Sequence, residues 1–149
     1  MVVYGPSYVD DRGPLTSSAY HVVTNEKDFL TENNRNTNYW STEIAGTGED
    51  ARLYMAFACP TTIRGFKIKN THNARWNNVG TNQFKILTST TDSGPWTVIL
   101  SGNLPDARNV DPVPVLQFPL ENSLTTQYIM FQIETYYGTG GGLQYFATY

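Results

Sequence analysis

The chain has 149 residues and a formal net charge of −3, with 40% hydrophobic and 15% charged residues. This length and composition are typical of one folded domain and exclude a disordered chain. The charge argues against a nucleic-acid partner, because neutralising phosphates requires a basic stripe that the sequence lacks. The 13% share of aromatic residues suits both β-sheets and binding surfaces.

Signals for targeting and for disulfide formation are absent from the sequence. The first six residues lack the basic region and apolar stretch of a signal peptide, and no Asn-x-Ser/Thr glycosylation site occurs. Cys59 is the only cysteine, so no internal disulfide can form, and we expect a buried or half-buried structural thiol. No apolar run is long enough to span a bilayer. These features fit an intracellular protein without requiring one.

The predicted elements are short strands. Residues 1–50 show little periodicity; 1–24 form a less regular segment, and 25–33 allow one helical turn. From residue 52 onward, apolar and polar positions alternate between turn signals, with Pro60 ending the first strand and 138–142 forming a flexible glycine loop. The predicted strands cover 52–58, 63–70, 82–88, 96–100, 115–120, 128–135 and 143–149. They predict one all-β domain over 1–149, an antiparallel β-sandwich of the jelly-roll type.

Three stretches carry a family resemblance in the middle of the chain. The first contains Ile63-Arg64-Gly65-Phe66-Lys67-Ile68 and leads into a polar loop over residues 70–80. A strand around 82–86, an Asp-Ser-Gly-Pro turn and a strand that begins at a tryptophan (96–104) follow. In the C-terminal half, 127–131 and 142–146 agree with the same order, and upstream 32–40 supplies an Asn-rich loop that ends in Tyr-Trp.

In this order the chain resembles discoidin (coagulation factor 5/8 type C) domains of the galactose-binding-like superfamily, over about residues 25–149. The resemblance implies a non-catalytic module that recognises carbohydrate or mediates cell adhesion through loops at one end of the sandwich. It also implies an extracellular setting, with a glycan or glycoprotein as partner. The alternative is a protein-interaction or structural module without a sugar ligand.

The expected binding surface comprises the loops at 70–80 and 136–142, flanked by 34–40. An aromatic face stacks on a sugar ring, while amide, imidazole and guanidinium groups bond to its hydroxyls. The alternative is a self-bonded turn at 70–73, with Trp76 capping the core. An exposed Trp76 could also touch a membrane, but the weak basic character disfavours anionic lipids. The candidate ligand-binding residues are Trp40, His72, Asn73, Arg75, Trp76, Asn77, Tyr136 and Tyr137.

A structural calcium ion is a further expectation from the resemblance, with Glu32 and Thr37 as ligands. Oxygen ligands on a tight loop suit calcium. The alternative is an Asn-rich loop held by its own turns. The closing strand carries Tyr145 and Ala147 where relatives carry acidic residues, and Arg75 alone stands in a loop where fucose-binding relatives use two arginines.

We expect no enzyme activity. The chain has only two histidines, His21 and His72, and lacks the nucleophile-elbow, phosphate-loop and zinc-protease motifs. The identity of the ligand and the oligomeric state stay open.

Overall fold

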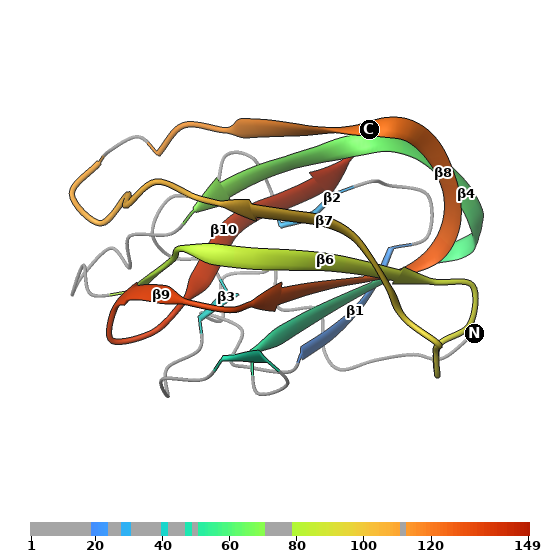
Figure 1. The fold of residues 1–149 in the computed structure, drawn as a ribbon, viewed down its shortest axis with the longest axis horizontal. Helices are drawn as coiled ribbons and strands as arrows, with labels where there is room; N and C mark the ends of the chain where they lie inside the picture. Colours follow the sequence, from blue (N-terminus) through green and yellow to red (C-terminus); the bar gives the residue numbers. More distant parts are fainter. Residues whose placement is uncertain are drawn as a thin grey trace.

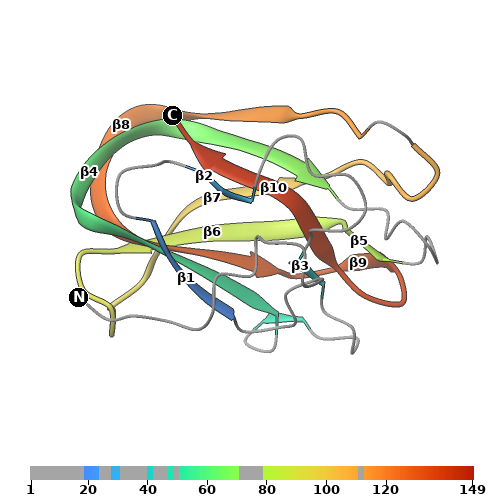
Figure 2. The same ribbon diagram turned by 180° about the vertical axis from the view of Figure 1, so that it is seen from behind.

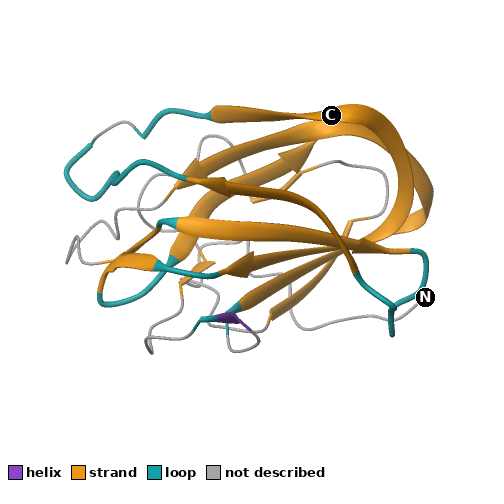
Figure 3. Cartoon of the chain, viewed as in Figure 1, coloured by secondary structure: helices purple, strands orange, loops and turns teal. Residues whose placement is uncertain are grey.

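The computed structural model describes residues 19–23, 28–30, 40–41, 47–48, 51–70, 79–110 and 113–149. Apart from a helical residue at Gly48, the regular structure in these ranges is entirely β-strand (Figure 3). None of the described residues forms a helix that could cross a membrane. The strands are β1 (Ala19–Val23), β2 (Asp28–Leu30), β3 (Trp40–Ser41), β4 (Arg52–Asn70), β5 (Val79–Thr81), β6 (Gln83–Ser89), β7 (Thr97–Asn103), β8 (Leu116–Ile133), β9 (Tyr136–Gly138) and β10 (Gly142–Thr148).

Two long strands, β4 and β8, belong to both layers of the sandwich. They pair antiparallel from Arg52↔Gln132 to Ile68↔Leu116, and both ribbons curve at the same end of the molecule (Figure 1). The first layer contains β1, residues 52–57 of β4, residues 128–133 of β8, β6 and β7. The second layer contains residues 63–70 of β4, residues 116–124 of β8, β10 and β2. Figure 1 views the sandwich from the side of β6 and β7, and Figure 2 from the side of β10.

The predicted sandwich is confirmed, but four of the predicted strands join in pairs to form two long strands. Residues 52–58 and 63–70 form the single strand β4, so Pro60 does not end it. Pro60 is exposed and lies where the pairing register shifts, between Ala56 and Thr61, so its missing N–H removes no bond from the paired stretches. Likewise, 115–120 and most of 128–135 join in β8. The strand pairs are antiparallel as predicted, except that β1 pairs with β4 in parallel.

Two local expectations were wrong. Asp28–Leu30 forms β2 instead of a helical turn, because it pairs with Phe146 and Ala147 of β10, a partner that local sequence does not reveal. Cys59 is exposed, because it lies in the curved part of β4 where the strand leaves its regular pairing. The exposed position also leaves Cys59 outside the packed core.

Four phenylalanines join the two layers. Phe84 stacks on Phe131 in the first layer, with ring centroids 5.0 Å apart, and Phe66 stacks on Phe146 in the second, at 5.5 Å. The rings of Phe131 and Phe146 meet edge to face across the interior, at 5.5 Å. All four side chains are fully buried. Because aromatic burial is among the largest favourable contributions to a core, these contacts hold the layers together.

Gly65 allows the C-terminal residue to lie against β4. The backbone N–H of Tyr149 donates to the carbonyl of Gly65 at 3.1 Å, and the N–H of Arg64 donates to the carbonyl of Tyr149 at 2.6 Å. A Cβ at Gly65 would lie 2.5 Å from the Tyr149 hydroxyl oxygen and 2.8 Å from the carbonyl oxygen of Phe118. The glycine in the Ile-x-Gly-Phe pattern is therefore required by close approach of neighbouring atoms.

We expect Gly65→Ala to lower the free energy of unfolding by about 1–3 kcal/mol, because the added methyl group overpacks the site. Urea unfolding measures the loss. The same substitution in a Tyr149→Ala background should cost less, since only the Phe118 carbonyl then remains in the way. Equal losses in the two backgrounds would show that Tyr149 does not lie against Gly65 in solution.

Candidate functional site

The candidate site lies at the end of the sandwich opposite the curve of β4 and β8, where the segments around β5 and β9 meet (Figure 1). β5 begins within the last two residues of the predicted loop at 70–80, and β9 forms the start of the predicted loop at 136–142. The two strands pair antiparallel as Val79↔Gly138, Gly80↔Tyr137 and Thr81↔Tyr136. The two segments that we expected to share one binding surface therefore lie side by side.

A buried asparagine fixes the base of the 70–80 loop. Asn70 is the last residue of β4 and is only 3% exposed. Its Nδ2 donates to the carbonyl oxygens of Thr81 and Pro105, at 2.9 and 3.1 Å, and its Oδ1 accepts from the backbone N–H of Thr81 at 2.9 Å. One side chain thus joins both ends of the loop to the segment after β7. A buried amide with these bonds holds its neighbours in a defined geometry.

Further bonds attach β5 to the start of β10. The hydroxyl of Thr81 donates to the carbonyl of Gly142 at 2.7 Å, and the backbone N–H of Gly142 lies 3.1 Å from the same hydroxyl oxygen. The N–H of Gly80 donates to the carbonyl of Gly140 at 2.9 Å. Gly140 and Gly141 are buried. The glycine-rich segment is therefore packed against β5 along this part of its length.

Tyr137 holds three segments together at this end. Its hydroxyl lies 3.0 Å from the carbonyl oxygen of Leu104 and 3.2 Å from Oδ1 of Asn82, and it can donate to one of them at a time. The Arg108 guanidinium lies over the Tyr137 ring, 5.9 Å from its centroid. Tyr136 is half-buried and packs against the hydrophobic core. Of the two tyrosines, only Tyr137 has these polar contacts with the β7–β8 segment.

Arg108 is itself held by a carboxylate. Its Nε and Nη2 donate to the two carboxylate oxygens of Asp106, at 2.9 and 2.8 Å, and its backbone N–H donates to Oδ1 at 3.1 Å. The hydrogen bonds from Arg108 hold the pKa of Asp106 below its usual value, while partial burial acts in the opposite direction. The same pair raises the pKa of Arg108. A guanidinium held in this way has a defined orientation over the Tyr137 ring.

Most of the sequence-predicted contact residues lie outside the described residues, namely His72, Asn73, Arg75, Trp76 and Asn77. The ends of their loop are described and are fixed as above. The backbone of Trp40 is described: it pairs with Leu143 of β10, directly after the 136–142 segment. The third predicted segment therefore reaches the same end of the sandwich.

The predicted calcium ligands Glu32 and Thr37 also lie outside the described residues. On the closing strand, Tyr145 and Ala147 are both buried and supply no carboxylate. Within the ranges that the structure describes, no group of three or more His, Cys, Asp or Glu side chains could hold a metal. The described part of this end thus lacks a carboxylate set for the ion.

Three contributors to this end were missed in the sequence, namely Asn82, Asp106 and Arg108. A signal for two of them exists, since Asp106-Ala107-Arg108 after a proline is a pattern in which an Asp side chain accepts from the backbone two residues later. Asn82 shows no such local signal, because its partners are Tyr137, Asn103 and Leu104. Chemically, the end offers a half-buried aromatic ring, a held guanidinium and side-chain amides, which suits hydrogen bonding to a polar ligand.

Comparison with known proteins finds similarity in structure alone. No protein-family model matches the chain, and no curated protein matches it. Among solved structures, the CBM32-5 module of GH89 from Clostridium perfringens, in complex with GalNAc-β-1,3-galactose, has a TM-score of 0.63 at 11% identity, covering 81% of each chain. The family 32 carbohydrate-binding module of Clostridium perfringens NanJ, in complex with galactose, has a TM-score of 0.60 at 14% identity, covering 78% of this chain and 79% of the module.

This chain therefore shares the β-sandwich fold of these carbohydrate-binding modules. A GH29 fucosidase from Ruminococcus gnavus, in complex with fucose, also matches, with a TM-score of 0.58 at 17% identity. The match covers 78% of this chain but only 21% of the fucosidase chain. The same fold thus occurs both in short modules and as one part of a longer enzyme chain.

We expect Asn70→Ala to lower the free energy of unfolding by about 2–4 kcal/mol, because it leaves the buried N–H and carbonyl of Thr81 without their partner and also removes the bond to the carbonyl of Pro105. Urea unfolding tests this. The matched control is Asn103→Ala, which removes an exposed amide and should change stability by no more than about 0.5 kcal/mol. Similar small losses for both variants would contradict the role given to Asn70.

Replacing Arg108 by Ala should raise the pKa of Asp106 toward the value of an isolated aspartate. The bridge stabilises the fold above the unfolded-state pKa of Asp106, and this contribution is lost as the pH falls through the lowered folded-state pKa. Because both side chains are partly exposed to solvent, which screens the pair, the effect on stability is small. A carboxyl-carbon NMR titration of both proteins measures the shift; an unchanged midpoint would mean that the bridge does not form in solution.

Proposed function

We propose that this chain is a non-catalytic glycan-binding module that holds its ligand at the loop end of the sandwich. The observation that carries the proposal is the arrangement around Asn70. One buried amide fixes both ends of the 70–80 loop beside β9 and the β7–β8 segment. Binding residues on a loop require such a rigid base, because an ordered loop loses less conformational entropy on binding.

The residues of that loop have the chemistry that sugars require. Trp76 supplies an aromatic face, and His72, Asn73, Arg75 and Asn77 supply donors and acceptors for hydroxyls. The neighbouring strand adds Tyr136 and Tyr137 as proposed contacts, and Trp40 lies on the third segment at this end. Structures with the same fold were solved with galactose, with GalNAc-β-1,3-galactose and with unsaturated mannuronic acid bound. These likenesses support a sugar as the ligand class.

The alternative, a module that docks another protein, is not favoured by the described surface. The exposed large hydrophobic residues there are Val98, at 47% exposure, and Val110, at 41%. Val98 lies near the start of β7, whereas Val110 lies in the segment after it, so the two do not form one patch. A protein-docking face would need a contiguous apolar area.

We expect the chain to bind one or more sugars on a glycan array, and Trp76→Ala to weaken that binding about tenfold or more through loss of ring stacking. Titration calorimetry on the array hits measures the change, and circular dichroism checks the fold. The control is Val98→Ala, which truncates an exposed side chain away from the loop end. Both proteins are assayed with calcium and with EDTA, because Glu32 and Thr37 are the proposed ligands of a structural calcium.

No binding across the array in either condition would contradict the proposed function and favour the protein-docking alternative. If Trp76→Ala and Val98→Ala lose sugar affinity equally, the chain binds a sugar but not at the loop end.

A further inference from the structure

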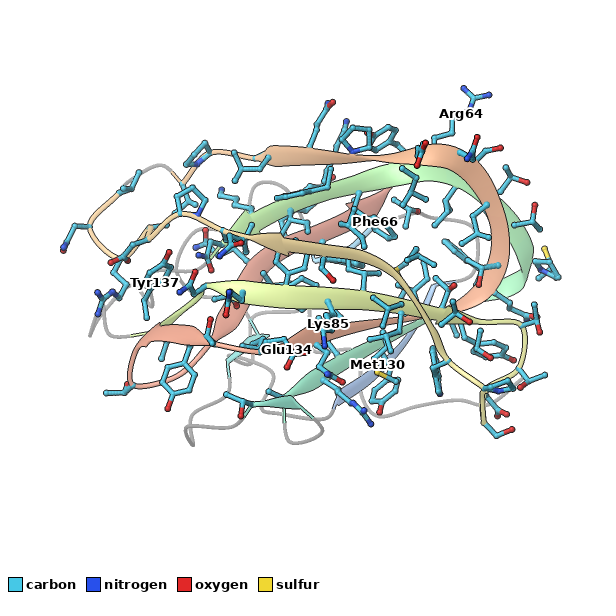
Figure 4. All side chains as sticks on the ribbon, in the orientation of Figure 1. Arg64, Phe66, Lys85, Met130, Glu134 and Tyr137 are labelled. Atoms are coloured by element: carbon cyan, nitrogen blue, oxygen red, sulfur yellow. The ribbon has the colours of Figure 1, made fainter. Side chains whose placement is uncertain are left out.

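A groove lies beside the loop end, on the outer face of the first layer. It has a volume of about 420 Å³. Figure 4 shows Lys85 and Glu134 next to one another on this face. The lining residues come from β6, β7 and the residue after β8, and they are Gln83, Phe84, Lys85, Ser101, Gly102, Asn103 and Glu134. Every one of them is among the described residues.

The strand register explains why this part of the sheet is hollow. β6 and β7 pair as Gln83↔Asn103, Phe84↔Gly102 and Lys85↔Ser101. Phe84 is buried in the core, and a Cβ at Gly102 would lie against the Phe84 ring, so this middle pair faces inward. The floor of the groove is therefore backbone. Side chains rise only from the pairs on either side of it, because successive residues of a strand point to opposite faces.

A salt bridge forms one wall of the groove. The ammonium group of Lys85 lies 3.1 Å from Oε1 of Glu134, on the side of β6 away from its β7 partner, the small Ser101. The same Glu134 oxygen accepts from Gln132 at 3.0 Å, and Gln132 accepts from Nε of Arg52 at 2.8 Å. This chain of bonds holds the carboxylate in place, so little ordering is required when a ligand arrives.

The groups around the groove suit a neutral ligand that is rich in hydroxyls. Lys85 and Glu134 offset each other's charge, so the groove has no net charge with which to hold an ion. An ammonium donor beside a carboxylate acceptor can serve two adjacent hydroxyls, and the amides of Gln83 and Asn103 and the hydroxyl of Ser101 both donate and accept. Phe84, the one large apolar side chain of the lining, is buried beneath the floor, which disfavours a lipid or an apolar peptide.

The groove and the loop end meet at Asn82. Its Oδ1 lies 3.2 Å from Nδ2 of Asn103, at the end of the groove, and 3.2 Å from the hydroxyl of Tyr137, at the loop end. A ligand held at the loop end can therefore extend past Asn82 onto the face of β6 and β7. We infer that the module binds a chain of neutral sugars, with one end at the loops and the following residues in the β6–β7 groove. This inference rests on the proposed function and adds that affinity increases with the length of the bound saccharide.

The test compares galactose with two neutral hexasaccharides, β-1,4-galactohexaose and cellohexaose, by amide NMR titration of the whole chain. Galactose should shift the amide signals of the loop end alone. At least one hexasaccharide should also shift those of Lys85, Ser101, Asn103 and Glu134, and should bind about tenfold more tightly, the effect of one or two added hydrogen bonds to charged groups. Hexasaccharides that leave the groove signals unmoved would overturn the inference.

Two groove variants complete the test. Ser101→Trp fills the groove, and Glu134→Gln removes the carboxylate charge with little change of shape. Both should abolish the advantage of the hexasaccharide and leave galactose binding unchanged. Thr97→Trp is the matched control, since it places the same bulk on an exposed position of β7 outside the groove. A preserved hexasaccharide advantage in both groove variants would count against the inference.

The outcomes also separate this inference from the proposed function. If galactose shifts the loop-end signals and no saccharide shifts the groove signals, the module is a sugar binder but the groove is not part of its binding site. If no saccharide shifts the loop-end signals, both the proposed function and this inference are contradicted.

Discussion

The pairing of β4 with β8 is the constraint on which the rest of the structure depends. The two strands pair on both sides of the curve, with a shift of register at the curve itself, and so run from one layer into the other. Because each strand belongs to both layers, this end of the sandwich is closed by continuous backbone. The layers are then held at a spacing at which Phe131 and Phe146 meet across the interior. The opposite end is where β5, β9 and the β7–β8 segment gather (Figure 1).

The loop end depends on a small number of buried polar groups. Asn70 satisfies backbone groups of Thr81 and Pro105, which belong to two different segments, and the Thr81 hydroxyl satisfies both backbone groups of Gly142 at the start of β10. Such bonds are specific in geometry, since a buried amide without its partner is costly. The positions of the two ends of the 70–80 loop relative to Tyr137 therefore follow from buried side chains that are not among the proposed ligand contacts.

Asn82 gives the loop end a connection to the outer face of the sheet. Its side chain accepts from groups on both sides, one belonging to the loop end and the other to the groove. A sugar that contacts only the loop end makes few bonds, and its affinity is correspondingly limited. A site that continues along the sheet would gain affinity from each further residue of the chain. The groove that would allow this arises from the pairing of β6 with β7, which places Phe84 opposite Gly102 so that both face inward.

The alternation of apolar residues was sufficient to predict an all-β sandwich, and the glycine of the Ile-x-Gly-Phe pattern and the two loop segments were recognisable from the sequence. Local patterning could not show that β4 and β8 each run through their curves, because a turn-like sequence such as the one around Pro60 has the same appearance in a bend as in a break. It also could not show that Asp28–Leu30 pairs with β10, that Cys59 is exposed, or that Asn82 joins Tyr137 to Asn103. Strand periodicity is a property of neighbours along the chain, and the sequence by itself determined that much. Bends, edge pairing and polar contacts between residues tens of positions apart depend on which segments meet, and only the tertiary structure decided them.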